Sequence, residues 1–202
     1  MGPQDPTIAK ILDFWFGLPT QEWFGDKHDE YITKNFAKLV DKARLTAELD
    51  EEWTRTPSGS LALILLLDQF TRNIFRPKSH PDPALSWSGD SKAHELALRA
   101  ISKGWDIEIM KQNATHANRG YSHRTFFYLP LMHAEDMTSQ IACCALSQNM
   151  AHELETAYGL TFAIRHRDCI AAFGRFPGRN ESLGRSSTEE EKRFLESHPE
   201  GF

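Results

Sequence analysis

The sequence predicts an all-α fold in a single domain that covers residues 1–202. Every long segment repeats its apolar residues at the spacing of a helix, and no segment alternates apolar and polar residues as a half-buried strand would. A chain of 202 residues with 40% hydrophobic residues can also bury one full core without a second domain. These observations together predict one helical domain.

The first helices are marked by their start signals. Residues 5–17 begin with Asp-Pro, which suits a helix N-terminus, and we expect a helix there. Asp26 is the expected N-cap of a long amphipathic helix. The apolar stretch 57–75 is rich in Leu and Ala rather than in β-branched residues, and it is too long for a typical buried strand. We expect it to be the central helix.

Three boundaries are expected further along the chain. Ser88 or Asp90 is predicted to cap the next helix. Residues 111–122 are polar and aperiodic, so we expect a long exposed loop of the type that covers functional sites. Pro130 is predicted to begin a helix that continues to about Tyr158, because proline suits the first turn of a helix.

The C-terminal part of the chain carries two more predicted helices. One follows Gly159 and has an apolar face. The other follows a Gly/Pro-rich loop, and Ser187 with Glu190 is predicted to form its capping box. The whole chain is therefore expected to be helical.

Charge and cysteine content exclude several classes of protein. A net charge of -5 and a pI near 6.0 argue against a general nucleic-acid-binding protein. The longest uniformly apolar run, 61–67, is far too short to cross a membrane, and the N-terminus lacks a signal-peptide pattern. The three cysteines include no C-x-x-C pair and no disulfide framework. We therefore expect a cytoplasmic protein that binds neither nucleic acid nor membranes.

The sequence also lacks the common cofactor and hydrolase motifs. It contains no G-x-G-x-x-G, P-loop, H-E-x-x-H or G-x-S-x-G motif. This argues against dinucleotide-binding, nucleotide-binding, zincin and α/β-hydrolase functions. We expect no cofactor and no metal, which leaves cofactor-free chemistry or binding.

Two histidines are the leading candidates for chemistry. His166 is centred on an apolar helix face, where it is either a hydrogen-bonded core residue or a pocket group. His133 begins a polar stripe, whose further members are Asp136, Gln140, Cys143 and Ser147. An apolar stripe lies beside it, formed by Met137, Ile141, Cys144, Ala145 and Gln148. Because two such faces must pack together in a single core, we expect the two histidines to converge on one pocket.

Asp68 and Arg72 interrupt the buried face of the predicted central helix. They are four residues apart, which is the spacing that lets the two side chains pair. As functional residues they would face the same cavity as His133. The alternative is an ion pair that only fixes the packing.

Three arginines, Arg175, Arg179 and Arg185, lie on the Gly/Pro-rich loop before the last helix. Guanidinium groups beside a helix N-terminus make a candidate site for a carboxylate or a phosphate. The alternative is that they tie the loop to helix C-terminal carbonyls and acidic side chains.

The blocks LALILLLDQFTRNIF, RTFFYLPLMHAED and HRDCIAAFGRFPGRN-ESLGRSSTEEEKRFL resemble domain-of-unknown-function family 924, a group of small proteins placed with the tetratricopeptide-like helical folds. The resemblance covers nearly the whole chain. It implies a tetratricopeptide-like superhelix, although no internal repeat of about 34 residues is visible. It also implies a polar cluster but no settled reaction. The family's pattern matches this chain at Asp68, Gln69, Arg72, Asn73, Arg124, His133, Glu135, Asp136, Gln140, His166, Arg175, Arg179, Asn180, Arg185 and Thr188.

The chain departs from that pattern at two positions. Thr71 stands where the family typically has proline, and Gly178 stands where it has histidine. No role of that histidine is therefore carried over to this chain.

The leading hypothesis is a small-molecule enzyme without a cofactor. His133 and His166 would transfer a proton, with Asp68, Glu135 or Asp136 as orienting carboxylates. The ligand would be an anionic or carboxylate-bearing metabolite, and the reaction an isomerisation, cyclisation, dehydration or hydrolysis. The candidate substrate-binding residues are Arg72, Asn73, Arg124, Gln140, Arg175, Arg179 and Asn180.

Two other functions compete with this one. A helical binding module would hold a peptide or protein partner on an aromatic surface formed by Trp105, Phe126, Phe127 and Tyr128. A metal enzyme is the third hypothesis, with possible ligands His133, Glu135, Asp136, His166 and Asp168. The spacing of these residues matches no standard metal site.

Overall fold

The buried apolar stretch forms the helix around which the N-terminal half is built. In the computed structural model, which describes residues 5–77, 79–113, 119–154 and 158–198, this stretch comprises α4 (Pro57–Ile64), the π-helical turn η2 (Leu65–Phe70) and α5 (Thr71–Ile74). Every residue from 59 to 71 is buried. The prediction of a central helix is confirmed, but the sequence pattern does not predict the π-helical turn.

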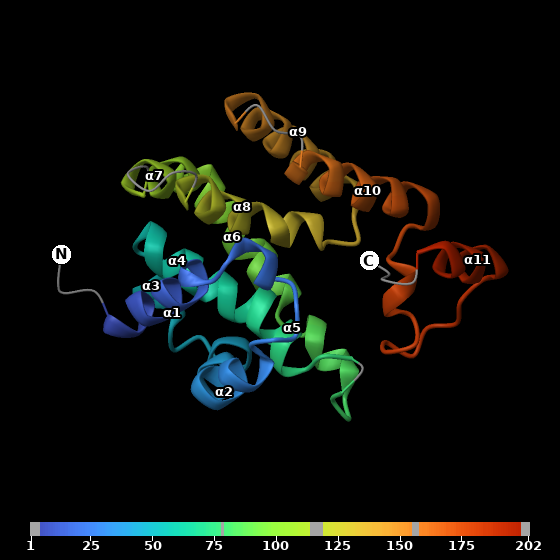
Figure 1. Cartoon of the computed structure of the whole chain (residues 1–202), viewed down its shortest axis with the longest axis horizontal. Helices are drawn as coiled ribbons and strands as arrows, with labels where there is room; N and C mark the ends of the chain where they lie inside the picture. The colour runs from blue at the N-terminus through green and yellow to red at the C-terminus, as the bar shows by residue number, and fades with distance from the viewer. Residues whose placement is uncertain (1–4, 78, 114–118, 155–157, 199–202) are drawn as a thin grey trace.

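The helices formed by residues 6–53 pack around this central helix (Figure 1). Asp5 caps the first of them by accepting a hydrogen bond from the amide of Thr7, as predicted. The second does not use Asp26 as its N-cap, because His28 occupies that position without a side-chain hydrogen bond. These elements are α1 (Pro6–Gly17), η1 (Thr20–Glu22), α2 (Asp29–Leu45) and α3 (Asp50–Trp53).

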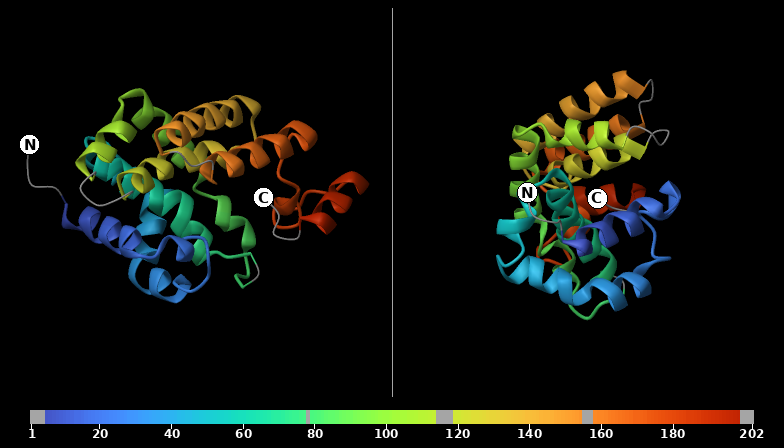
Figure 2. Two further views of the ribbon diagram at one scale, coloured as in Figure 1. Left: turned by 45° about the horizontal axis from the view of Figure 1, so that its top comes forward. Right: turned by 90° about the vertical axis from the view of Figure 1, so that its left-hand side faces the viewer.

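The second half of the chain adds a further helical layer. Figure 1 shows α7 to α10 above α1, α2 and α4, and α11 at the far end of the molecule, and the turned views in Figure 2 agree. The described residues contain no strand. The elements are η3 (Pro83–Trp87), α6 (Asp90–Ser102), α7 (Trp105–Gln112), α8 (Arg119–Met132), α9 (Met137–Leu154), α10 (Tyr158–Phe173), η4 (Pro177–Arg179) and α11 (Glu189–Ser197).

Pro130 lies inside α8 and does not begin a helix, so that prediction is wrong. The aromatic residues that precede it are helical and form part of the core. α8 continues for only two residues after Pro130, so the burial of this last turn outweighs the loss of one backbone hydrogen bond. α9 begins later, and the carboxylate of Asp136 accepts a hydrogen bond from the amide of Ser139 in its first turn at 2.9 Å.

Three other predicted boundaries also differ. Gly89 occupies the N-cap position of α6, so neither Ser88 nor Asp90 caps it. The predicted loop 111–122 is helical at both ends, and its residues 114–118 lie outside the described residues. The capping box of α11 is made by Thr188 and Glu191, one residue later than predicted.

One apolar core joins the helices from α1 to α10. A second, small cluster of Cys169, Ile170 and Phe176 receives Phe194 of α11 and holds the C-terminal segment on the body. The described chain is thus an all-α domain, as predicted. No helix within the described ranges has the length and apolar character needed to cross a membrane.

Candidate functional site

The site centres on a hydrogen bond between Asp68 and His133. Nδ1 of His133 lies 2.7 Å from Oδ1 of Asp68. A carboxylate only accepts, so His133 donates this bond through its Nδ1–H. Its Nε2 makes no hydrogen bond with any described part of the chain. The neutral ring therefore carries its basic lone pair on Nε2.

The π-helical turn η2 supplies Asp68 from the most buried part of the molecule. Asp68 is 0% exposed. Burial by itself would raise the pKa of this carboxyl, but the facing charges of His133 and Arg72 and the hydrogen bonds from His133 and Gln69 hold it well below its usual range. Asp68 is therefore a carboxylate at neutral pH. Single π-helical turns inside α-helices frequently occur at functional sites.

His166 approaches His133 from α10. The two ring centroids are 6.2 Å apart, so the predicted convergence of the histidines is found. Nδ1 of His166 donates to the carbonyl of Phe162 at 2.8 Å. Burial and the nearby His133 lower the pKa of His166 to about 3, so this ring is neutral at physiological pH.

Asp90 joins two arginines on the other side of the site. Its carboxylate accepts two hydrogen bonds from Arg72, at 2.8 and 3.0 Å, and one from Arg179 at 3.2 Å. Arg72 also lies 3.3 Å from Asp68, so the predicted i,i+4 pair exists. Arg72 and Asp90 therefore connect Asp68 with Arg179.

Gly89 explains why Asp90 lies so close to the π-helical turn. A Cβ atom at Gly89 would lie 2.3 Å from the carbonyl oxygen of Leu67. Any other residue would push the start of α6 away from η2. This glycine therefore brings Asp90 within reach of Arg72.

Arg179 closes the site from the C-terminal loop. It donates to the backbone carbonyl of His133 at 2.9 Å, and its guanidinium lies over the ring of Phe176 at 4.7 Å and that of Trp87 at 5.7 Å. Its buried Nε has no hydrogen-bond partner among the described residues. Burial lowers the pKa of Arg179 to about 10, so the group remains a cation at neutral pH.

Glu135 and the other predicted site residues of the C-terminal loop hold the C-terminal segment in place. Glu135 pairs with Arg185 at 2.6 and 3.0 Å and accepts the amide of Phe176 at 2.8 Å. Arg175 and Asn180 bond instead to Glu191 of α11. The alternative interpretation, that these arginines tie the loop to helix C-terminal carbonyls and acidic groups, describes all three. Arg179 bonds to Asp90 and to the carbonyl of His133, and through these bonds it also reaches the histidine site.

Arg124 and Asn73 lie in other networks. Arg124 donates to the hydroxyl of Tyr128 at 2.6 Å and to Glu153 at 2.7 Å. Asn73 donates to Asp29 of α2 at 2.9 Å. Neither makes a hydrogen bond to Asp68, His133, His166 or Arg179 among the described residues. The structure therefore does not bring these two predicted ligand-binding residues into the site.

Gln140 and Asp136 serve the ends of helices. The side-chain amide of Gln140 donates to the carbonyls of Met132 and Ala134 at 2.7 and 2.8 Å, at the end of α8. Asp136 caps the start of α9. The predicted polar stripe does not include His133 and Asp136, because both residues precede α9. Its remaining residues Gln140, Cys143 and Ser147 are buried, whereas Ile141 of the neighbouring stripe is 57% exposed.

The aromatic residues proposed as the surface of a binding module lie in the core and form no exposed surface. Phe126, Phe127 and Tyr128 are buried in the core, at 1%, 0% and 1% exposure. Trp105 packs against the same core. The sequence alone cannot separate a buried aromatic run from a binding surface, because both are apolar.

The acidic and histidine side chains do not converge as a metal site would require. Within the described ranges, no group of three or more His, Cys, Asp or Glu side chains is arranged to hold a metal ion. Asp168 pairs with Arg167 on the exposed side of α10 and is 60% exposed. The residues suggested as a ligand set are thus divided among several networks.

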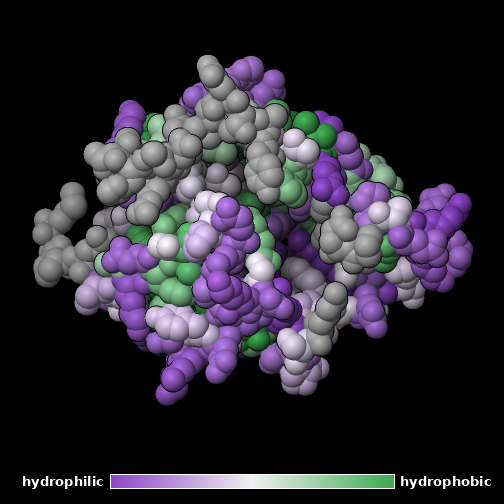
Figure 3. Space-filling view, in the orientation of Figure 1, coloured by the Kyte–Doolittle hydropathy of each residue, from purple (hydrophilic) through white to green (hydrophobic). Residues whose placement is uncertain are grey.

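The molecular surface is hollowed near the site. Figure 3 shows a hollow between the N-terminal helices and the α10–α11 region, with hydrophilic residues at its visible floor. In the same orientation, Figure 1 places the C-terminal end of α8 behind this hollow. The side chain of His133 is 16% exposed, so part of it contacts solvent.

Sequence reasoning misses Asp90 and Trp87 as site residues. The pattern around Asp90 indicates only a helix cap, and Trp87 lies in the short helix η3. The only available signal is an aspartate and a tryptophan close together on a Gly/Ser-rich segment before a helix. Their role depends on a contact with Arg179, which is 89 residues from Asp90.

Comparison with known proteins agrees with the resemblance noted in the sequence. Residues 11–199 match the family described as "Bacterial protein of unknown function (DUF924)". The chain belongs to the DUF924 family. A solved structure titled "Structure of Protein of Unknown Function ATU0120 from Agrobacterium tumefaciens" is similar to this DUF924 protein, with a TM-score of 0.80 and 35% identity over 95% of this chain and 98% of that one. No curated protein matches.

The two departures from the family pattern have different surroundings in this DUF924 protein. Thr71 is buried, and its hydroxyl donates to the carbonyl of Leu67 at 2.8 Å, next to the π-helical turn. Gly178 is exposed in η4, beside Arg179. Neither departure removes a residue of the Asp68–His133 network.

Proposed function

We propose that this DUF924 protein is a small-molecule enzyme that performs acid/base chemistry without a cofactor, with His133 as the group that accepts and returns the proton. The Asp68–His133 hydrogen bond carries the proposal. A buried carboxylate fixes the imidazole by its Nδ1–H and leaves Nε2 for a substrate. Catalytic histidines oriented by a carboxylate follow the same logic.

The proton transfer would use the two histidines differently. Nε2 of His133 takes a proton from the substrate, and the Asp68 carboxylate stabilises the imidazolium that forms. His166 is neutral and donates through Nδ1 to Phe162, so its Nε2 can only accept a hydrogen bond. We therefore assign the transfer itself to His133, with His166 as the neutral ring beside it.

The substrate would be an anionic or carboxylate-bearing metabolite. Support comes from Arg179, a buried cation whose Nε lacks a partner in the described chain and whose guanidinium lies against two aromatic rings. The guanidinium of Arg179 is planar, so its remaining N–H groups point in fixed directions. This geometry suits a carboxylate or carbonyl oxygen of the ligand. Isomerisation, cyclisation, dehydration and hydrolysis can each use a base and a cation of this kind.

Two broader features belong to the proposal. The consecutive packing of α7 with α8, α8 with α9 and α9 with α10 supports a tetratricopeptide-like arrangement of helix pairs. The unpaired state of Cys143, Cys144 and Cys169 supports a reducing location such as the cytoplasm.

A metabolite extract can identify the substrate class. The purified protein is incubated with a bacterial extract, and mass spectrometry follows which compounds disappear and which appear. Compounds bound by the native state are found in parallel by their effect on the melting temperature. We expect an anionic compound to be converted by the wild type and by His152→Gln, an exposed control, but not by His133→Gln. Conversion by neither wild type nor control, or equal conversion by all three, contradicts the proposal.

A further inference from the structure

A cavity lies at the end of α8 opposite to His133. It has a volume of about 380 Å³, which falls within the range of small-molecule sites. His123 lines it, ten residues before His133, which corresponds to roughly 15 Å along a helix axis. None of its described lining residues belongs to the Asp68–His133 network.

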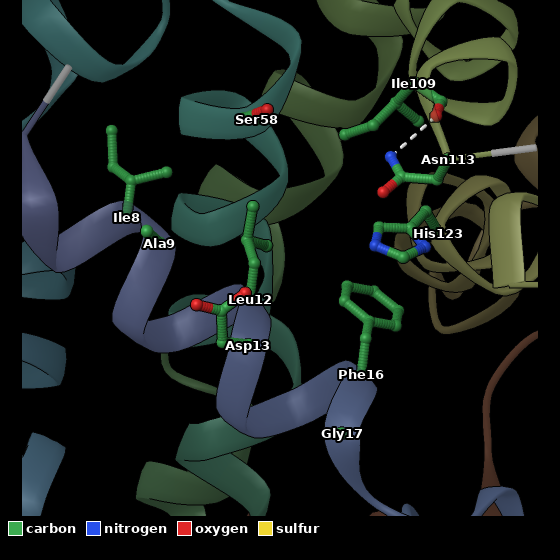
Figure 4. Close-up of a pocket in the computed structure, with 10 residues that line it drawn as sticks. All are labelled: Ile8, Ala9, Leu12, Asp13, Phe16, Gly17, Ser58, Ile109, Asn113 and His123. Carbon is green, nitrogen blue, oxygen red and sulfur yellow. Dashed lines mark hydrogen bonds between the residues drawn. The ribbon is translucent and has the colours of Figure 1, made fainter. Parts of the chain in front are cut away.

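Apolar side chains form one part of the cavity wall, beside polar groups. Ile8, Leu12 and Phe16 on α1 and Ile109 on α7 supply hydrocarbon surface. The ring of His123 stacks on that of Phe16 with a centroid distance of 3.6 Å and an interplanar angle of 18°. Figure 4 shows these two rings together at one side of the cavity, across from Ile8 and Ser58. A flat aromatic molecule can contact both rings and the aliphatic wall.

Two of the polar groups at the cavity offer oxygen acceptors. Asn113 donates one amide hydrogen to the carbonyl of Ile109 at 2.9 Å, drawn as a dashed line in Figure 4, which leaves its Oδ1 to accept and its second amide hydrogen to donate. Asp13 contributes an exposed carboxylate that forms no ion pair within the described chain. No lysine or arginine is among the described lining residues. The Asp13 carboxylate therefore favours a ligand with positive charge.

We infer that this cavity binds a small amphipathic molecule with an aromatic body and an amine end. The ring would lie against Phe16, His123 and Leu12, and the ammonium would face Asp13. The proposal does not depend on the chemistry at His133, and the two ligands have opposite charge. It also differs from the peptide-binding hypothesis, because a volume of about 380 Å³ suits one small molecule.

Three indole compounds separate the contribution of the ring from that of the charge. Tryptamine, tryptophol and indole-3-acetate carry similar rings with a cationic, neutral and anionic end, and each is titrated into the protein by isothermal calorimetry at low ionic strength. We expect tryptamine to bind tightest, about two- to five-fold more tightly than tryptophol, because an exposed carboxylate adds a modest electrostatic gain. Indole-3-acetate should bind most weakly.

Substitutions at Ala9 and Asp13 test whether the compounds bind in this cavity. Ala9→Trp introduces a large side chain at an exposed lining position and should weaken tryptamine binding at least tenfold, whereas Ala145→Trp, at an exposed position on α9, should not. Asp13→Asn, a surface change that leaves the fold intact, should abolish the preference for tryptamine over tryptophol. The proposal is overturned if none of the three compounds binds at millimolar concentration, if Ala9→Trp binds as the wild type does, or if indole-3-acetate binds best.

Discussion

Asp68 and His133 are 65 residues apart in the sequence, and their side chains meet at 2.7 Å. The carboxylate comes from a π-helical turn in the core, and the imidazole comes from the segment just after α8. This contact gives His133 a fixed orientation and a defined tautomer. The contact, the elements that support it and its chemical role can each be tested by substitution.

Asp68→Asn should lower the free energy of unfolding by about 3 kcal/mol, because it removes the buried negative charge that faces the half-buried Arg72 and His133. Urea titration at pH 7 measures the change. Asp168→Asn, which alters an exposed carboxylate on α10, is the matched control and should change stability by less than about 1 kcal/mol. Equal stability of Asp68→Asn and the wild type would show that the charge at Asp68 is not needed.

The stability of the protein should fall as the pH decreases from 7 to 5, and His166 should cause part of this fall. The folded state keeps His166 neutral down to a pKa of about 3, whereas the unfolded chain takes up a proton near pH 6.5. Between pH 7 and 5 the unfolded state thus binds more protons than the folded state. Lowering the pH therefore stabilises the unfolded state relative to the folded state and lowers the free energy of unfolding. The contribution is about 2 kcal/mol between pH 7 and 5.

The test is a comparison of urea titrations at these two pH values. His166→Gln cannot titrate and should show a pH dependence that is smaller by about 2 kcal/mol. The exposed control His152→Gln should behave as the wild type does. An identical pH dependence in wild type and His166→Gln would mean that His166 is protonated equally in both states.

Gly89→Ala should destabilise the fold by about 3 kcal/mol, because the added Cβ would lie 2.3 Å from the carbonyl oxygen of Leu67. Thermal unfolding followed by circular dichroism measures the effect. Gly17→Ala is the control, because a Cβ added at Gly17 would have no such neighbour within 4 Å. If both variants unfold at the wild-type temperature, the close contact between α6 and η2 is incorrect.

Arg185→Ala should loosen the C-terminal loop. Glu135 would lose its bidentate partner, and the amide of Phe176, which donates to Glu135, would become easier to open. Loss of a charged hydrogen bond of this type should speed hydrogen exchange of that amide about tenfold or more. Arg167→Ala, on the exposed side of α10, should leave the exchange rate unchanged, and equal rates in both variants would contradict the proposed tie.

The sequence alone predicted the all-α class and the main members of the polar network, Asp68, Arg72, His133 and His166. The pairing of Asp68 with Arg72 follows from their i,i+4 spacing. The meeting of His133 with His166 was predicted from two helix faces, but His133 lies between α8 and α9, so the prediction holds although its geometric reason does not. In contrast, the start of α9 could not be placed correctly, because proline is compatible with the last turns of a buried helix as well as with the first turn of a new one. The local signal at Pro130 does not distinguish these two positions.

The partners of the arginines could not be derived from the sequence for a different reason. Arg175, Arg179 and Arg185 have similar neighbours along the chain, yet one reaches Glu191, one reaches Asp90 and one reaches Glu135. These choices depend on where α6 and α11 lie in space. The π-helical turn could not be predicted because its residues follow the same apolar pattern as the α-helix around it.

The most direct test of the proposed chemistry is the turnover rate of His133→Gln on the substrate found in the metabolite extract. Glutamine keeps some hydrogen bonding but cannot exchange a proton, so kcat should fall by about two to four orders of magnitude. The melting temperature should stay close to that of the wild type, which separates a lost proton transfer from a lost fold. If His133→Gln turns the substrate over at the wild-type rate, His133 is not the proton-transfer group and the proposed function is wrong.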